Sequence, residues 1–119
     1  MSNQAIKLGD IFLVDWTPGR GSEQTSERPG MVVQTDAFNS NENYPNTVVV
    51  TLSKTGRNIP THVQVPRSDD NGLWEPVSYV KCEQLMTISK ARLGRRLGRL
   101  TESQISEVGG AIKRVFNFR

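Results

Sequence analysis

The chain has 119 residues, a mass of 13.3 kDa and a net charge of +3, which is the size of one domain. Its single cysteine, Cys82, and single histidine, His62, exclude an internal disulfide framework, a multi-cysteine metal site and a His-pair zinc site. The apolar runs are too short to span a membrane and the N-terminus lacks a signal-peptide pattern, so we expect one cytoplasmic domain over residues 1–119 with no membrane association.

The order of apolar and polar residues predicts a chain made mostly of short strands. Residues 11–16 are apolar on both alternating faces, which is typical of a strand buried from two sides. The breaker cluster at residues 17–19 then opens a long polar loop through Pro29, and a second strand is expected over residues 31–35. The remaining alternating runs predict strands over residues 47–53, 61–65, 77–81 and 85–88, with loops over residues 39–46 and 66–76.

The strand over residues 47–53 predicts the direction of its last side chain. Val48, Val50 and Leu52 share one face of an extended chain, so Ser53 belongs to the other face. If the first three residues face the core, Ser53 points outward at the end of the strand, where a ligand can reach it.

The C-terminal segment predicts one helix. Thr101 and Gln104 have the spacing of a capping box, and an apolar stripe at helical spacing follows: Ile105, Val108, Ile112 and Val115. Gly109-Gly110 lowers helix stability, so we expect close packing at that point. Short strands followed by one helix predict a mainly β fold, a small and strongly curved barrel whose C-terminal helix covers an opening or an edge.

Positive charge is concentrated toward the C-terminus. Residues 1–80 carry six basic and nine acidic side chains, whereas residues 81–119 carry nine basic and three acidic ones. Four arginines lie within eight positions: Arg92, Arg95, Arg96 and Arg99. Such a cluster indicates an RNA contact, a docking surface for an acidic protein segment or a solvated surface, and charge alone does not decide among them.

The loop before the second strand has the composition of an anion-binding site. Gly21-Ser22-Glu23-Gln24 combines a glycine, which lets the backbone approach a ligand, with hydrogen-bonding side chains. Arg28 adds a permanent charge, and Pro29 limits how far that arginine can move. Long polar loops in small domains are usually functional.

Several motifs, in this order and spacing, resemble those of the MazF/PemK-type toxins of type II toxin–antitoxin pairs. The resemblance extends from about Leu8 to Leu93. The motifs are Gly9-Asp10-Ile11, Asp15-Trp16-Thr17-Pro18, Gly21-Ser22-Glu23-Gln24, Arg28-Pro29, Thr61-His62-Val63 and Cys82-Glu83-Gln84-Leu85.

The resemblance implies a fold, an activity and partners. The expected fold is an SH3-like barrel of the CcdB/MazF/PemK toxin type that forms a homodimer. The expected activity is sequence-selective cleavage of single-stranded RNA, mRNA in the cell, with no metal ion and no cofactor. A cognate antitoxin protein is expected to inhibit the toxin by occupying the RNA groove, and the toxin–antitoxin complex is expected to bind promoter DNA.

The resemblance also assigns residues. The catalytic arginine of the family corresponds to Arg28, its catalytic threonine to Ser53, which retains a hydroxyl, and its loop glutamate to Glu23. Substrate-binding positions are expected at Ser22, Gln24, Lys54 and Gln84. Members often have an arginine where this chain has Met86, so this departure concerns base preference.

These residue types suit RNA cleavage by the ribose 2′-OH. Attack on the adjacent phosphate gives a 2′,3′-cyclic phosphate and a 5′-OH, and the extra negative charge of the phosphorane suits the guanidinium of Arg28. Ser53 can donate a hydrogen bond to a phosphate oxygen. Glu23, ionised at neutral pH, can accept the 2′-OH proton.

Two other functions are possible on the same barrel: a non-catalytic toxin that binds and poisons gyrase, and an inactive RNA binder. The Gly-Ser-Glu-Gln and Arg-Pro motifs favour the nuclease, because a docking surface does not need that polar set.

Single residues also have structural interpretations. A hydrogen-bonded structural role is favoured for His62, and a small buried side chain for Cys82. Trp16 and Trp74 are more typical of a core or interface, although Trp74 lies in a polar loop where it could stack on RNA.

Overall fold

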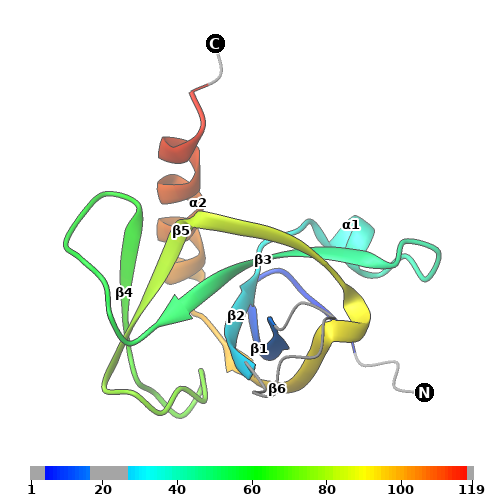
Figure 1. Ribbon diagram of the computed structural model, residues 1–119, viewed down its shortest axis with the longest axis horizontal. Coiled ribbons are helices and arrows are strands. Elements are labelled where there is room, and N and C mark those ends of the chain that lie inside the picture. The colour runs from blue at the N-terminus through cyan, green and yellow to red at the C-terminus, as the bar shows by residue number, and fades with distance from the viewer. Residues whose placement is uncertain (1–4, 17–26, 118–119) are drawn as a thin grey trace.

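The computed structural model describes residues 5–16 and 27–117, and in them six strands form one antiparallel sheet (Figure 1). The strand order across the sheet is β4-β5-β3-β2-β1-β6. The strands are β1 (Asp10–Asp15), β2 (Glu27–Val32), β3 (Asn46–Ser53), β4 (His62–Pro66), β5 (Val77–Ser89) and β6 (Leu93–Arg99). The helices are α1 (Asp36–Asn39), a 3-10 turn η1 (Lys90–Arg92) and α2 (Glu102–Val115). None of the helices in the described residues is long and apolar enough to cross a bilayer.

Several predicted boundaries are wrong, and the errors at β2 and β5 involve pairing with another strand. β2 begins at Glu27, so Arg28 and Pro29 lie inside a strand and not in the preceding loop, because pairing with β1 extends to Asp15↔Glu27. The two strands predicted over residues 77–81 and 85–88 are one strand, β5, with a bulge at residues 82–84 where its pairing with β3 shifts register. β6 and α1 were not predicted, since neither has a strong local pattern.

The sheet curls so that both of its faces bury apolar side chains. One core lies between the sheet and α2 and includes Ile11, Val50 and Leu52. A second core lies inside the curl and includes Phe12 and Val14. Neighbouring residues of β1 thus enter different cores, which confirms the strand buried from two sides.

The same curl decides the faces of β3. Val50 and Leu52 are buried as predicted, but Val48 is half-buried, because the second core takes Val49 instead. Ser53 ends β3 half-exposed, consistent with an outward side chain.

α2 covers β4 and β5 and is capped as the sequence predicts (Figure 1). The Thr101 hydroxyl accepts a hydrogen bond from the Gln104 N–H at 3.1 Å, and the Gln104 side chain accepts one from the Thr101 N–H at 3.0 Å. Val108 and Ala111 are buried against the sheet. The predicted close packing at Gly109-Gly110 is wrong: both glycines face solvent, and a Cβ at either position would meet no atom within 4 Å.

Replacing either glycine with alanine is therefore expected to stabilise the protein. Gly109→Ala and Gly110→Ala should each raise the free energy of unfolding by roughly 0.5–1 kcal/mol, because alanine loses less backbone entropy in a helix. Urea denaturation measures this change. Gly98→Ala is the contrasting variant and should destabilise, since a Cβ there would collide with the Asp70 carbonyl. Lower stability of both helix variants would contradict the prediction.

Candidate active site

Arg28 projects from a backbone that β1 holds in place. It pairs with Val14 in the β1–β2 ladder, and the indole Nε1 of Trp16 donates a hydrogen bond to the Arg28 carbonyl at 3.2 Å. Because Arg28 lies on a central strand, its backbone is held more rigidly than it would be in a loop.

The register between β2 and β3 brings Arg28 to Ser53. The last pair of this ladder is Gly30↔Thr51, and continuing the antiparallel register by two residues places Arg28 opposite Ser53. The ladder stops next to Pro29, which has no N–H to donate. The two strands are therefore unpaired at Arg28 and Ser53, and both residues line a cleft.

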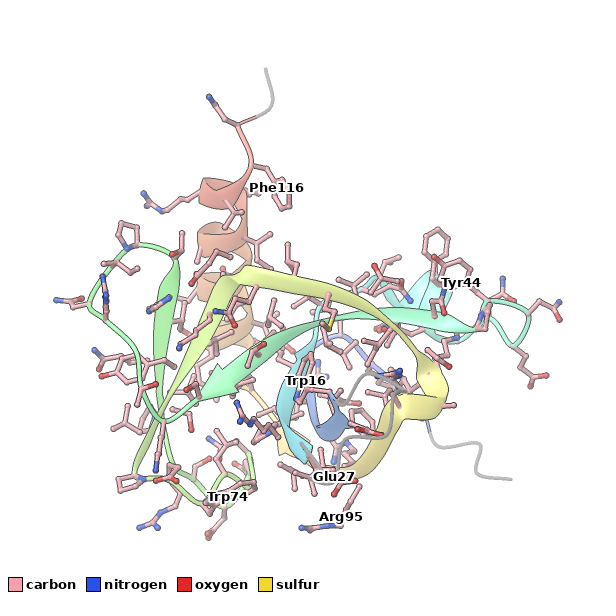
Figure 2. The ribbon with its side chains drawn as sticks, viewed as in Figure 1. Trp16, Glu27, Tyr44, Trp74, Arg95 and Phe116 are labelled. Carbon is pink, nitrogen blue, oxygen red and sulfur yellow. The ribbon has the colours of Figure 1, made fainter. Side chains whose placement is uncertain are left out.

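A cleft of about 390 Å³ opens at this point. The described residues that line it come from the start of β2, the end of β3, the loop after β4 and the start of β5: Arg28, Pro29, Leu52, Ser53, Lys54, Thr55, Leu73, Trp74, Glu75 and Ser78. Figure 2 shows Trp74 below the end of β3, on the loop that follows β4. Leu52 and Leu73 are buried members of the first core, so the cleft rests on packed apolar side chains.

The polar groups of the cleft suit a phosphate. Within the described part of the chain, the side chains of Arg28 and Lys54 form no ion pair, so both positive charges are available to an anion. The Ser53 hydroxyl accepts a hydrogen bond from the Thr55 N–H at 3.2 Å and lies 3.1 Å from the Thr55 hydroxyl. Two cations beside two hydroxyls can bind the non-bridging oxygens of a phosphodiester.

The structure brings together only part of the predicted site. Arg28, Ser53 and Lys54 share the cleft. Ser22, Glu23 and Gln24 lie outside the described residues. Gln84 is exposed on the bulge of β5 and does not line the cleft.

Seven of the ten described residues that line the cleft were missing from the predicted site, among them Thr55, Trp74 and Glu75. Thr55 could have been found from its spacing to Ser53. The polar loop did indicate that Trp74 could stack on RNA, but Trp74 was not assigned to the site. Glu75 has no comparable local signal, because only the packing of residues 66–76 against the sheet brings it to the cleft.

His62 and Cys82 have the structural roles predicted for them. His62 accepts a hydrogen bond from the Arg57 N–H at Nδ1 (3.0 Å), and its Nε2 lies 2.8 Å from the Glu83 carboxylate. Burial alone would raise the pKa of Glu83, but hydrogen bonds from His62 and Thr61 outweigh it and lower this pKa. Cys82 is fully buried, and burial, helped by the Glu83 charge, raises the pKa of its thiol to about 11.

Most of the arginine cluster is occupied by contacts within the chain. Arg96 and Arg99 both donate to the Asp10 carboxylate, at 3.1 and 3.3 Å, and Asp10 is only 3% exposed. Arg92 donates to the Asp15 carbonyl at 3.3 Å. Arg95 is exposed and projects outward (Figure 2). The cluster thus mainly attaches β6 to β1, an interpretation that charge alone did not provide.

Comparison with known proteins shows which family the chain belongs to. A family model described as PemK-like, MazF-like toxin of type II toxin–antitoxin system matches residues 7–116. Endoribonuclease MazF of Staphylococcus epidermidis is 36% identical over 110 residues, which cover 90% of this chain and 88% of that protein.

Two solved structures share the fold. An endoribonuclease in complex with its cognate antitoxin, from a Mycobacterial species, superposes with a TM-score of 0.72 at 27% identity, covering 92% of each chain. Mycobacterium tuberculosis toxin MazF-mt6 gives a TM-score of 0.70 at 27% identity, covering 89% of this chain and 94% of that one.

The curled six-stranded sheet with its C-terminal helix is the fold of these toxin structures, which confirms the predicted fold class. The chain belongs to the PemK-like, MazF-like toxin family of type II toxin–antitoxin systems, and its activity class is endoribonuclease. The matches give no support to the gyrase-poisoning alternative.

The Asp10 contacts predict a structural role for the arginines. Asp10→Asn should lower the free energy of unfolding by about 1–3 kcal/mol, because it removes the charge that Arg96 and Arg99 share at a buried position. Glu102→Gln is the matched control and should cost about 0.5 kcal/mol or less, since that carboxylate is 88% exposed and 3.5 Å from Arg99. Urea denaturation compares the two variants, and equal stabilities would refute the role given to Asp10.

Proposed function

We propose that this toxin cuts single-stranded RNA, mRNA in the cell, at short sequences by intramolecular attack of a ribose 2′-OH, without a metal ion or cofactor, and thereby inhibits translation and growth. The observation that supports this most directly is the convergence of Arg28 and Ser53 on one cleft beside Lys54. The relatives named endoribonucleases support the same reaction class.

In the proposed reaction the 2′ oxygen attacks the adjacent phosphorus, and the bond from phosphorus to O5′ breaks. The products are a 2′,3′-cyclic phosphate and a 5′-OH whose proton comes from solvent. Arg28 stabilises the phosphorane, because its planar guanidinium offers five N–H donors to the non-bridging oxygens. Ser53 already accepts from the Thr55 N–H, so its own proton can point to a phosphate oxygen.

Glu23 is the proposed base for the 2′-OH proton, with Ser22 and Gln24 binding substrate beside it. This assignment rests on the family motif. Lys54 is proposed to neutralise a phosphate in the cleft. Gln84, on the exposed bulge of β5, is proposed to contact nucleotides beyond it.

The proposed protein partner is a cognate antitoxin, as in the solved Mycobacterial complex. An acidic antitoxin segment in the cleft would meet the unpaired charges of Arg28 and Lys54 and so exclude RNA. We further propose that the toxin–antitoxin complex binds promoter DNA, which a promoter-fragment mobility shift tests. Because mRNA is translated in the cytoplasm, the toxin is proposed to act there, and cell fractionation tests that location.

The role of Arg28 predicts a large kinetic effect with an intact fold. Arg28→Ala should lower the cleavage rate by about 10²- to 10³-fold or more, because loss of one preorganised donor to developing charge has that effect. Arg28→Lys should restore activity only partly, since a point charge lacks the planar fork. Ser53→Ala should have a smaller effect. The assay is cleavage of a long RNA in excess chelator, with 5′-OH ends identified.

Arg114→Ala is the matched control, because Arg114 is an exposed arginine in the last turn of α2. It should cut at the wild-type rate, and melting temperatures of all variants should agree within a few degrees. Near-normal cleavage by Arg28→Ala would show that the proposed site is wrong. No discrete fragments from the wild-type protein would favour the inactive RNA binder.

The proposed assembly is a two-fold homodimer. The cleft is small compared with a stretch of single-stranded RNA, and self-association would join two such clefts into a longer groove. Sedimentation at micromolar concentration should give twice the 13.3 kDa of one chain. A monomeric species under those conditions would count against this assembly.

A further inference from the structure

The loop between β4 and β5 is a fixed platform beside the cleft. Asn71 is only 2% exposed and holds the loop from inside: its Nδ2 donates to the Pro66 carbonyl at 3.0 Å, and its Oδ1 accepts from the Ser68 and Leu73 N–H groups at 3.1 and 3.0 Å. Gly72 has a φ of +67°, and a Cβ there would collide with the Leu97 carbonyl of β6. The Arg99 N–H of β6 donates to the Asp70 carbonyl at 2.9 Å, so the loop is attached to the sheet as well as to its own start.

This platform presents an aromatic side chain that is about half exposed in the described structure. Leu73 is buried in the first core, whereas the next residue, Trp74, is 51% exposed at the cleft. The Arg67 guanidinium donates to the Trp74 carbonyl at 3.3 Å, and the Arg67 N–H donates to the Pro76 carbonyl at 3.0 Å. The residues before and after Trp74 are thus held in place, and this fixed backbone keeps the Trp74 ring exposed at the cleft.

The next residue adds a charge that is unexpected in a phosphate site. Glu75 is the one carboxylate among the described residues that line the cleft, and it forms no ion pair or hydrogen bond in the described structure. Its charge opposes binding of a phosphate between Arg28 and Lys54. A carboxylate at this place is therefore better suited to the donor groups of a base than to the backbone.

We propose that Trp74 and Glu75 bind and select one RNA base next to the phosphate held by Arg28, an inference that rests on the proposed function. Trp74 stacks on the face of the base, as aromatic side chains do with unpaired bases. Glu75 accepts N–H donors from its Watson–Crick edge. Guanine fits best, because its N1–H and N2–H are parallel donors that match the two carboxylate oxygens. Uracil fits worst, since its single N–H lies between two carbonyls that repel a carboxylate.

The stacking role is tested with Trp74→Leu and Trp74→Phe. Trp74→Leu should raise KM by roughly 5- to 150-fold, the range for loss of one stacked base, with little change in kcat. Trp74→Phe should retain most of the wild-type affinity. Phe38→Leu, on α1, is the control for losing an exposed aromatic ring and should leave both constants unchanged.

A binding measurement separates this inference from the proposed function. An RNA with a 2′-deoxy sugar at the cleavage site cannot be cut, and Trp74→Leu should weaken its binding by the same factor at roughly 50 and 200 mM salt, because stacking releases no counterions. For a Lys54→Gln variant, the loss of RNA-binding affinity relative to the wild type should instead be smaller at the higher salt concentration. Failure of the wild type to cut RNA would refute the proposed function, whereas this binding assay would still decide the inference.

The selecting role is tested with Glu75→Gln on four substrates that differ only in the base beside the scissile bond. The wild type should prefer guanine and discriminate most against uracil, and Glu75→Gln should reduce that difference at least 10-fold. Glu107→Gln, on the exposed face of α2, is the control and should keep the wild-type profile. An unchanged profile in Glu75→Gln overturns the selection. A wild-type KM in Trp74→Leu overturns the stacking. Loss of the dimer in sedimentation of Trp74→Leu also overturns it and assigns Trp74 to a protein interface.

Discussion

The pairing of β2 with its two neighbours is the constraint on which the site depends. On one side β1 pairs with β2 along its length and fixes the backbone of Arg28. On the other side the ladder with β3 ends at Gly30, next to a proline that cannot donate to it. At Arg28, β2 is therefore paired with β1 on one side and unpaired on the side that faces β3. A shift of one residue in this register would turn Arg28 away from Ser53.

The division of the positive charges follows from burial. Asp10 is buried and needs partners, and Arg96 and Arg99 supply them. These arginines therefore contribute to joining β1 and β6, although their spacing resembles a nucleic-acid-binding cluster. Arg28 and Lys54 have no such acidic partner in the described residues, so their charges remain available at the cleft. The buried Asp10 carboxylate thus gives two arginines a structural role, while the cations of the cleft have no such role.

The curl of the sheet holds the residues of the cleft in fixed positions. Because both faces of the sheet are buried, the strands that carry the site pack from two sides. Leu52 and Leu73 lie in the core directly below the polar groups. The loop that carries Trp74 is held by a buried asparagine and a glycine with positive φ, so it does not depend on a ligand for its order. A site on such supports is preorganised, as charge stabilisation in a transition state requires.

By itself the sequence determined the features that depend on residues close together in the chain. A run that is apolar on both faces predicts β1, alternation predicts most of β3 and β4, and the capping box predicts the start of α2. The motif from Gly21 to Pro29 predicts the family, and parity predicts an outward Ser53. These features depend on periodicity and capping within a few residues, which the linear chain records directly.

Only the tertiary structure decided what depends on distant partners. β6 is a strand because it pairs with β1, where Asp10 meets Arg99 across most of the chain. That pairing also gives the arginines their role. The packing of α2 on β4 and β5 leaves Gly109-Gly110 in solvent instead of against a neighbour. Glu75 lines the same cleft as Arg28 only through the packing of its loop on the sheet. Local pattern cannot encode these results, because contact between residues far apart in sequence is set by register and by how the sheet curls.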